Sequence, residues 1–233
     1  MVLLAGFFIA YTSFRKFVTH RPLTSSLRSS KARSGCYEFS ETRTGGNRQP
    51  KLIRVPWCRQ ATGTYCCPAV MQSLIYYYCA NNPKERFIRQ DTLAKELETG
   101  EGGTSFCAVE KVAKRHGLQA KSYHNMGLHS LKSNLDRDRP VICSIQAWRD
   151  FYIPYKCDWN DGHFVIAIGY DEKNIYFMDP SVLGNYTYIP ILEFLERWHD
   201  LDVDEVTQLI QSGVAVWRDK PKEYIPRRIL RTG

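Results

Sequence analysis

The segment QATGTYCCPA, residues 60–69, decides how the rest of this sequence is interpreted. Pro68 favours the first turn of a helix, because its fixed φ suits a helix and its missing N–H would have no partner there. Apolar residues then recur at helical spacing, which predicts a helix over 68–80. Cys66 therefore lies directly before a helix N-terminus, where free N–H groups and the helix dipole favour an anion.

This position suits a reactive thiol. A thiol attacks only as the thiolate, and an unperturbed cysteine with a pKa of about 8.5 holds little thiolate at neutral pH. A helix start favours the thiolate and so favours Cys66 as a nucleophile. Two structural cysteines, Cys66 and Cys67, would occupy the same place, so position alone leaves both interpretations open.

A catalytic thiolate needs an oriented base. Among the six histidines, His163 stands where a loop enters an apolar strand, with Gly162 before it, and such a junction is a rigid mount for a catalytic group. A histidine satisfied within the core is the alternative. The other five are expected in the N-terminal segment, at a helix end or on the surface: His20, His116, His124, His129 and His199.

The runs 163–170 and 175–179 are joined by a turn and predict a β-hairpin whose second strand ends at Asp179. With the tightest pairing across the turn, His163 lies opposite Val182, three residues or roughly 10 Å beyond Asp179. A bulge, strand coiling or side-chain reach would have to close that gap. The hairpin thus permits a His–Asp pair, although Asp-Pro is also an ordinary strand ending.

Gln60, six residues before Cys66, is the candidate donor for an oxyanion hole. A side-chain amide and a backbone N–H can together hold the oxyanion that develops during acyl transfer. Taken alone, one glutamine carries little information, and it gains meaning only beside Cys66 and His163.

Helices are expected early in the chain and strands later, which favours an α+β fold over a doubly wound sheet. The remaining expected elements are an extended segment at 52–56, helices at 91–97, 108–116, 130–136 and 191–198, and a buried strand at 140–147.

The net charge of +8 resides at the two ends of the chain. Residues 1–37 hold six Lys or Arg and no acid, residues 218–233 hold six basic and two acidic residues, and residues 38–217 therefore carry about −2. The body has no basic face, so no nucleic-acid partner is expected. No run reaches the roughly 18 apolar residues of a membrane span, so a soluble protein is expected.

Three regions are expected: a leader and linker at 1–50, a folded body at 51–217 and a basic tail at 218–233. The leader is rich in Ser and Arg, lacks acids over its first 37 residues and begins with an apolar run, a composition typical of organellar transit peptides. A secretory signal and a plain extension remain alternatives, so the localisation stays open.

The eight cysteines form no C-x-x-C pair, and no H-E-x-x-H motif occurs, so neither a metal nor another cofactor is expected. Cys79, Cys107 and Cys143 lie in apolar segments and are expected in the core. Cys36, Cys58 and Cys157 could form disulfides in an oxidising compartment.

The ordered set of motifs resembles the C39 and C39-like family of papain-like cysteine peptidases. The resemblance covers about residues 52–200. It rests on Gln60, Cys66, Pro68-Ala69, His163 and Asp179-Pro180, with Gly103-Thr104-Ser105, His116-Gly117-Leu118, Arg139-Pro140-Val141-Ile142 and Gly162-His163-Phe164-Val165 between them.

The resemblance implies an α+β papain-like fold in which the cysteine helix packs on a small antiparallel sheet that carries the histidine. It also implies that Asp179 orients the imidazole and that Gln60 serves the oxyanion. Some members remove double-glycine leaders while fused to a transporter. This chain shows no transporter domain, so the expected protein is a stand-alone thiol hydrolase acting on a peptide or protein.

Two departures from the family pattern concern the nucleophile. Tyr65 stands where the family usually has Asp, and Cys67 stands where it has Gly. Cys67 could share the role of attacker or form a vicinal disulfide with Cys66. Two other functions also stay open, namely a peptide-binding module without activity and an enzyme that transfers the acyl group to an amine.

Overall fold

The computed structural model describes residues 50–79, 88–150, 152–182 and 184–218. All of them lie in one compact unit, residues 47–233. The expectations for the leader and for most of the basic tail fall outside the described residues, and so does Cys36.

An antiparallel sheet with the strand order β1-β8-β2-β3-β4-β5 forms the centre of this unit, and a two-stranded sheet, β6-β7, accompanies it. The strands of the main sheet are β1 (Gln119–Tyr123), β2 (Val141–Gln146), β3 (Gly162–Tyr170), β4 (Asn174–Met178), β5 (Thr187–Pro190) and β8 (Gly213–Trp217). The small sheet consists of β6 (His199–Leu201) and β7 (Gln208–Ile210).

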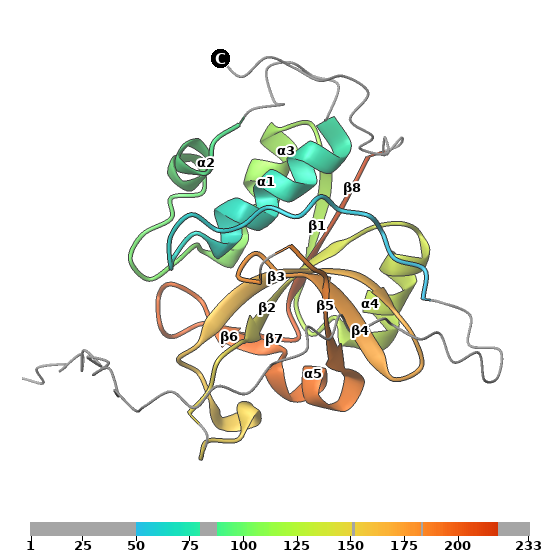
Figure 1. Cartoon of the computed structure of the whole chain (residues 1–233). Helices are drawn as coiled ribbons and strands as arrows, with labels where there is room; N and C mark the ends of the chain where they lie inside the picture. Colours follow the sequence, from blue (N-terminus) through green and yellow to red (C-terminus); the bar gives the residue numbers. More distant parts are fainter. Residues whose placement is uncertain (1–49, 80–87, 151, 183, 219–233) are drawn as a thin grey trace, which may run out of the picture. The chain divides into compact units, whose positions relative to one another are not determined.

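The helices are α1 (Cys66–Cys79), α2 (Gln90–Glu96), α3 (Phe106–Arg115), α4 (Gly127–Asp136) and α5 (Ile191–Arg197), with a short 3-10 turn η1 (Tyr155–Cys157). In Figure 1, α1, α2 and α3 lie together on one side of the sheet and α5 lies on the other. This arrangement confirms the expected α+β class with an antiparallel sheet.

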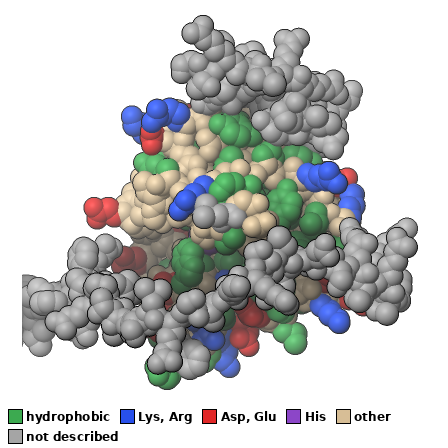
Figure 2. Space-filling model, in the orientation of Figure 1, with side chains coloured by type: hydrophobic (Ala, Val, Ile, Leu, Met, Phe, Trp, Pro, Cys, Tyr) green, Lys and Arg blue, Asp and Glu red, His purple; other side chains and the backbone are tan. Residues whose placement is uncertain are grey.

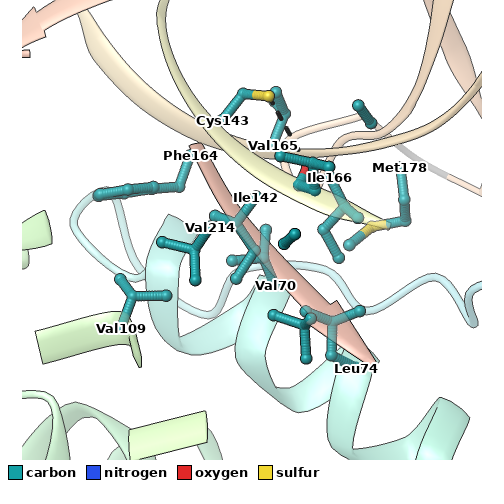
Figure 3. Packing of buried hydrophobic residues seen from close by; sticks show 14 of the residues in the cluster. Val70, Leu74, Val109, Ile142, Cys143, Phe164, Val165, Ile166, Met178 and Val214 are labelled. Carbon is teal, nitrogen blue, oxygen red and sulfur yellow. Dashed lines mark hydrogen bonds between the residues drawn. The ribbon is translucent and has the colours of Figure 1, made fainter. Parts of the chain in front are cut away.

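The face of α1 that was expected to be apolar anchors the helix on the sheet. Val70 and Leu74 are fully buried, and Figure 3 shows them directed toward the region of Ile142 and Val214. Burying such a side chain contributes about 1.5–3 kcal/mol, so this face holds α1 firmly against the strands. The helix begins two residues earlier than expected, which places Cys66 within its first turn.

A bulge in β3 changes the expected register of the hairpin. Tyr170 pairs with Ile175 as anticipated, but the register shifts by one residue between Ala167 and Gly169. The segment before α1 lies against this bulge, because the N–H of Ile53 donates to the carbonyl of Ile168 at 2.7 Å. The bulge reduces the offset between His163 and Asp179 from three residues to two. An even offset places both side chains on the same side of the sheet.

Two sequence expectations are wrong in detail. Cys107 is exposed at the start of α3 and is not a core residue. His199 is buried rather than on the surface, and it packs against Trp159 with its Nε2 2.7 Å from the carbonyl of Asp158. Cys58 and Cys157, whose pairing the sequence left open, are both free thiols in this structure.

Candidate active site

His163 is held from one side by Asp179. Its Nε2 lies 2.8 Å from Oδ1 of Asp179, and the imidazole is only 1% exposed. The same carboxylate oxygen accepts hydrogen bonds from the backbone N–H and the hydroxyl of Ser181, at 2.8 and 2.7 Å. Three donors around one carboxylate oxygen fix the direction of Asp179 and therefore the plane of the imidazole.

His163 also interacts with the nucleophile candidate, because the thiol of Cys66 is one of the groups that raise the pKa of the imidazole. Because Nε2 is occupied by Asp179, Nδ1 is the ring nitrogen left to accept the thiol proton. Burial lowers the pKa of His163, but the hydrogen bonds with Asp179 and Cys66 and their negative charges outweigh it and raise the pKa to about 9. Burial works against ionisation of Asp179 too, yet the bond with His163 brings the pKa of Asp179 below its ordinary value.

The second thiol of the pair points elsewhere. Cys67 is fully buried in the hydrophobic core, and Thr104 is one of the groups that act on the pKa of its thiol. Burial, followed by the neighbouring Cys66, raises the pKa of Cys67 well above its ordinary value, so it stays a thiol. Both cysteines are free, and no vicinal disulfide joins them.

The loop before α1 is tied to the segment that carries Asp179. The indole N–H of Trp57 donates to the carbonyl of Asp179 at 3.1 Å, and the backbone N–H of Gln60 donates to the carbonyl of Pro180 at 3.0 Å. These two bonds bring the 57–60 segment into the same site as the His–Asp pair.

The side chain of Gln60 is turned into its own loop. Its Nε2 donates to the carbonyls of Thr62 and Gly63, at 3.0 and 3.3 Å, while its buried Oε1 has no hydrogen-bond partner. The amide therefore lies near the site, with its donors engaged by the loop that leads to Cys66.

Gln90 braces that loop from α2. Its Oε1 accepts from the N–H of Ala61 at 2.8 Å, and its Nε2 donates to the carbonyl of Arg59 at 2.7 Å. The pattern of the sequence singled out neither Gln90 nor Ser181, because isolated polar residues beside a loop have no periodic signal.

A buried carboxylate supports the strand on which His163 is mounted. Asp200 accepts from the hydroxyl of Ser144 at 2.6 Å and from Nε2 of Gln146 at 3.1 Å. Burial raises the pKa of Asp200, while these donors oppose the shift. A Cβ on Gly162 would collide with both carboxylate oxygens of Asp200, so the close packing of strand and carboxylate requires glycine there. Of the residues in this contact, only Gly162 was singled out from the sequence.

Trp148 lies beside the imidazole on the outer side of the site. The centroids of the two rings are 4.8 Å apart, and the Trp148 side chain is 54% exposed. The indole of Trp148 therefore packs against the imidazole while much of the residue remains in contact with solvent.

Other classes of site receive no support from the described residues. Among them, no group of three or more His, Cys, Asp and Glu is arranged to hold a metal ion, and no helix is long and apolar enough to cross a membrane. On the face drawn in Figure 2, Lys and Arg side chains lie among Asp and Glu and do not gather over one element.

A pocket of about 280 Å³ lies between the end of α2 and the start of α3 and is lined by Gly103 and Ser105.

Comparisons with known proteins concern the fold and the family of this chain. The model of the Peptidase_C39 like family matches residues 52–217. A solved structure from Bacillus anthracis described as a C39-like peptidase aligns with a TM-score of 0.54 at 16% identity, over 74% of this chain and 100% of that one. The peptidase domain of Streptococcus ComA, a bifunctional ABC transporter, aligns with a TM-score of 0.51 at 15% identity, over 70% and 98%. No curated protein matches the chain by sequence.

Proposed function

Because the chain belongs to the Peptidase_C39 like family, we propose that it is a cysteine peptidase whose nucleophile is Cys66 and whose base is His163. The observation that carries this proposal is one buried imidazole that interacts with both a carboxylate and a thiol. His163 lies 2.8 Å from Asp179, and the thiol of Cys66 is one of the groups that raise the pKa of His163. This is the order of groups that activates a thiol for acyl transfer.

The reaction begins with transfer of the Cys66 proton to Nδ1 of His163. The resulting thiolate attacks the carbonyl carbon of the scissile amide and forms a tetrahedral oxyanion. Nδ1–H then protonates the leaving amine, the C–N bond breaks, and an acyl-thioester remains on Cys66. Water loses a proton to the neutral imidazole, attacks the thioester and releases the carboxylic acid, which restores the thiol.

Asp179 keeps the imidazole in the working orientation and stabilises its cationic form. This role is supported by the hydrogen bond with Asp179, which is one of the causes that raise the pKa of His163 against the effect of burial. Ser181 holds the carboxylate, so its role is to position Asp179 rather than to touch the substrate.

Gln60 is the proposed oxyanion donor together with the backbone N–H of Cys66, which has no intrahelical acceptor in the first turn of α1. For this role the amide of Gln60 must release the longer of its two bonds, the one to the carbonyl of Gly63 at 3.3 Å. Loss of one oxyanion donor lowers kcat about 10²- to 10³-fold in enzymes that use such a hole. Gln60→Ala is expected to fall in this range.

The test is hydrolysis of a peptide library by the full-length protein, with products identified by mass spectrometry. We expect cleavage by the wild type, loss of cleavage by Cys66→Ala, and retained cleavage by Cys67→Ala, a matched variant one residue away. If Cys67→Ala loses activity as fully as Cys66→Ala while staying folded, the single-nucleophile mechanism is wrong. If the wild type binds peptides without cleaving them, the chain is a binding module.

A further inference from the structure

The side-chain amide of Gln90 holds the residues on both sides of Gln60. Its Nε2 donates to the carbonyl of Arg59 at 2.7 Å, and its Oε1 accepts from the N–H of Ala61 at 2.8 Å. The backbone N–H of Gln60 itself donates to the carbonyl of Pro180 at 3.0 Å. The backbone is therefore held before, at and after Gln60, and the side chain of Gln60 is the part that remains free to turn.

Gln90 also joins this loop to the helix that begins with the candidate nucleophile. Its Nε2 donates a second hydrogen bond, to Oε1 of Gln72 at 2.9 Å, and Gln72 belongs to α1, which begins at Cys66. Gln72 is held in turn, because its own Nε2 donates to the carbonyl of Ile88 at 2.7 Å. One side chain at the start of α2 thus connects residues 59–61 to α1.

An amide suits this position better than a carboxylate of the same length. A glutamine side chain offers two N–H donors and a carbonyl acceptor, and Gln90 uses both donors and the acceptor. A carboxylate would keep the acceptor but would face two oxygens, those of Arg59 and Gln72, without a proton between them. The two bonds to the loop lie at the surface, so water can replace them with little loss of stability.

Resting on the proposed peptidase function, we infer that Gln90 is a positioning residue, which holds the loop at 59–61 so that the amide of Gln60 can reach the oxyanion. Oxyanion donors are effective because they are in place before the negative charge develops. With the backbone held, the amide of Gln60 has only to leave the carbonyl of Gly63, 3.3 Å away. Gln90 therefore acts through Gln60, and not through the thiol or the imidazole.

The experiment measures kcat and KM of the full-length protein on a peptide that the library assay shows to be cleaved. Gln90→Met, which has nearly the size of glutamine without its hydrogen bonds, should lower kcat about tenfold and leave KM within about twofold of the wild type. Gln90→Glu should also lower kcat, although it keeps the acceptor for Ala61. Thr92→Ala, at an exposed position of the same helix, is the control and should have the kinetics of the wild type.

Coupling to Gln60 distinguishes a positioning role from a structural one. In a Gln60→Ala background, Gln90→Met should change kcat by less than about twofold, because the donor that Gln90 positions is gone. The rate at which iodoacetamide modifies Cys66 should be the same in Gln90→Met as in the wild type.

Four results would overturn the inference while the peptidase activity stands. They are an unchanged kcat in Gln90→Met, an effect on KM alone, an equally large effect in the Gln60→Ala background, and a slower modification of Cys66 in Gln90→Met. Absence of cleavage by the wild type is a different result, because it would overturn the proposed function and the inference with it.

Discussion

The two adjacent cysteines differ in role, because one step along the helix turns one side chain toward the candidate site and the other into the core. Cys66 reaches His163, whereas Cys67 is fully buried beside Thr104. The sequence predicted Cys66 from its place before a helix, but it could not exclude Cys67, because both residues occupy the first turn. Only the direction in which the helix packs on the sheet distinguishes them.

We predict that the two thiols respond in opposite ways to truncation. Cys67→Ala removes a buried sulfur and should lower the free energy of unfolding by about 1–2 kcal/mol through the small cavity left behind, while the chemistry persists. Cys66→Ala should abolish hydrolysis. Because Cys66 is one of the groups that raise the pKa of His163, this variant should also lose part of the stability that depends on that shift. Guanidinium unfolding and peptide cleavage on both variants measure the two effects. Hydrolysis that persists in Cys66→Ala, or that is lost in a folded Cys67→Ala, would contradict this division.

The raised pKa of His163 makes part of the stability depend on pH. Its pKa is about 9 in the folded protein and about 6.5 in an unfolded chain. The stabilisation from this shift is therefore complete below pH about 6.5, is lost as pH rises through about 9, and amounts to about 3 kcal/mol. His163→Gln should lack this pH-dependent part. Unfolding free energies of both proteins between pH 5 and 10 test it, and a constant difference between them across that range would contradict the assignment.

Among the elements, the bulge in β3 decides whether His163 and Asp179 can meet. The sequence predicted the hairpin and also predicted a gap of three residues between the two side chains. One extra residue near Ile168 converts an odd offset into an even one. A bulge was one of the ways considered to close this gap, but its position could not be foreseen, because the 51–53 segment packs against β3 there from far away in the sequence.

We predict that Gly169→Ala disturbs the bulge and the site together. A Cβ at this position would come within 2.5 Å of the carbonyl oxygen of Lys51, which belongs to backbone and cannot easily move away. Overpacking of this kind costs about 1–3 kcal/mol. The rate of hydrolysis should fall as well, because the position of Asp179 depends on the register. Gly102→Ala, where the added Cβ would meet no atom within 4 Å, is the control and should behave like the wild type.

The junction of β2, β3 and β6 holds the strand end on which His163 sits. Gly162→Ala should be strongly destabilising, since the new methyl group would overlap the carboxylate of Asp200. In an Asp200→Gly background the same change should cost much less, because the obstructing group is gone. A double-mutant cycle by thermal unfolding measures this coupling. Additive effects would show that Asp200 does not support the strand through this contact.

The elements that were not foreseen share a physical reason. β1 is an edge strand with a polar sequence, QAKSY, and its pairing with β8 joins segments about 90 residues apart. β6 and β7 have three residues each, too few to show a period. The elements with strong apolar periodicity or long apolar runs, α1, α3, β2 and β3, were found within two residues of their ends.

At the scale of the described unit, the hydrophobic core includes residues from Ile53, near the start of the unit, to Val216, near its end. The described unit contains every residue that we assign to the site, and the expected boundaries of the body, 51–217, stay a prediction. A chain shortened to 50–218 should unfold cooperatively at nearly the melting temperature of the full chain and cleave the same peptides. Calorimetry and the library assay test this. Loss of cleavage in a folded short chain would show that the terminal segments take part in the function.

The central claim is that His163 activates Cys66, and the rate of thiol alkylation tests it most directly. Full-length protein is treated with iodoacetamide at pH 7, and the modified cysteines are quantified by mass spectrometry over time. We expect Cys66 to react about tenfold or more faster than the exposed Cys107 and Cys157, and His163→Gln to remove this advantage. A Cys66 that reacts no faster than those two thiols, or whose rate is unchanged by His163→Gln, would contradict the account.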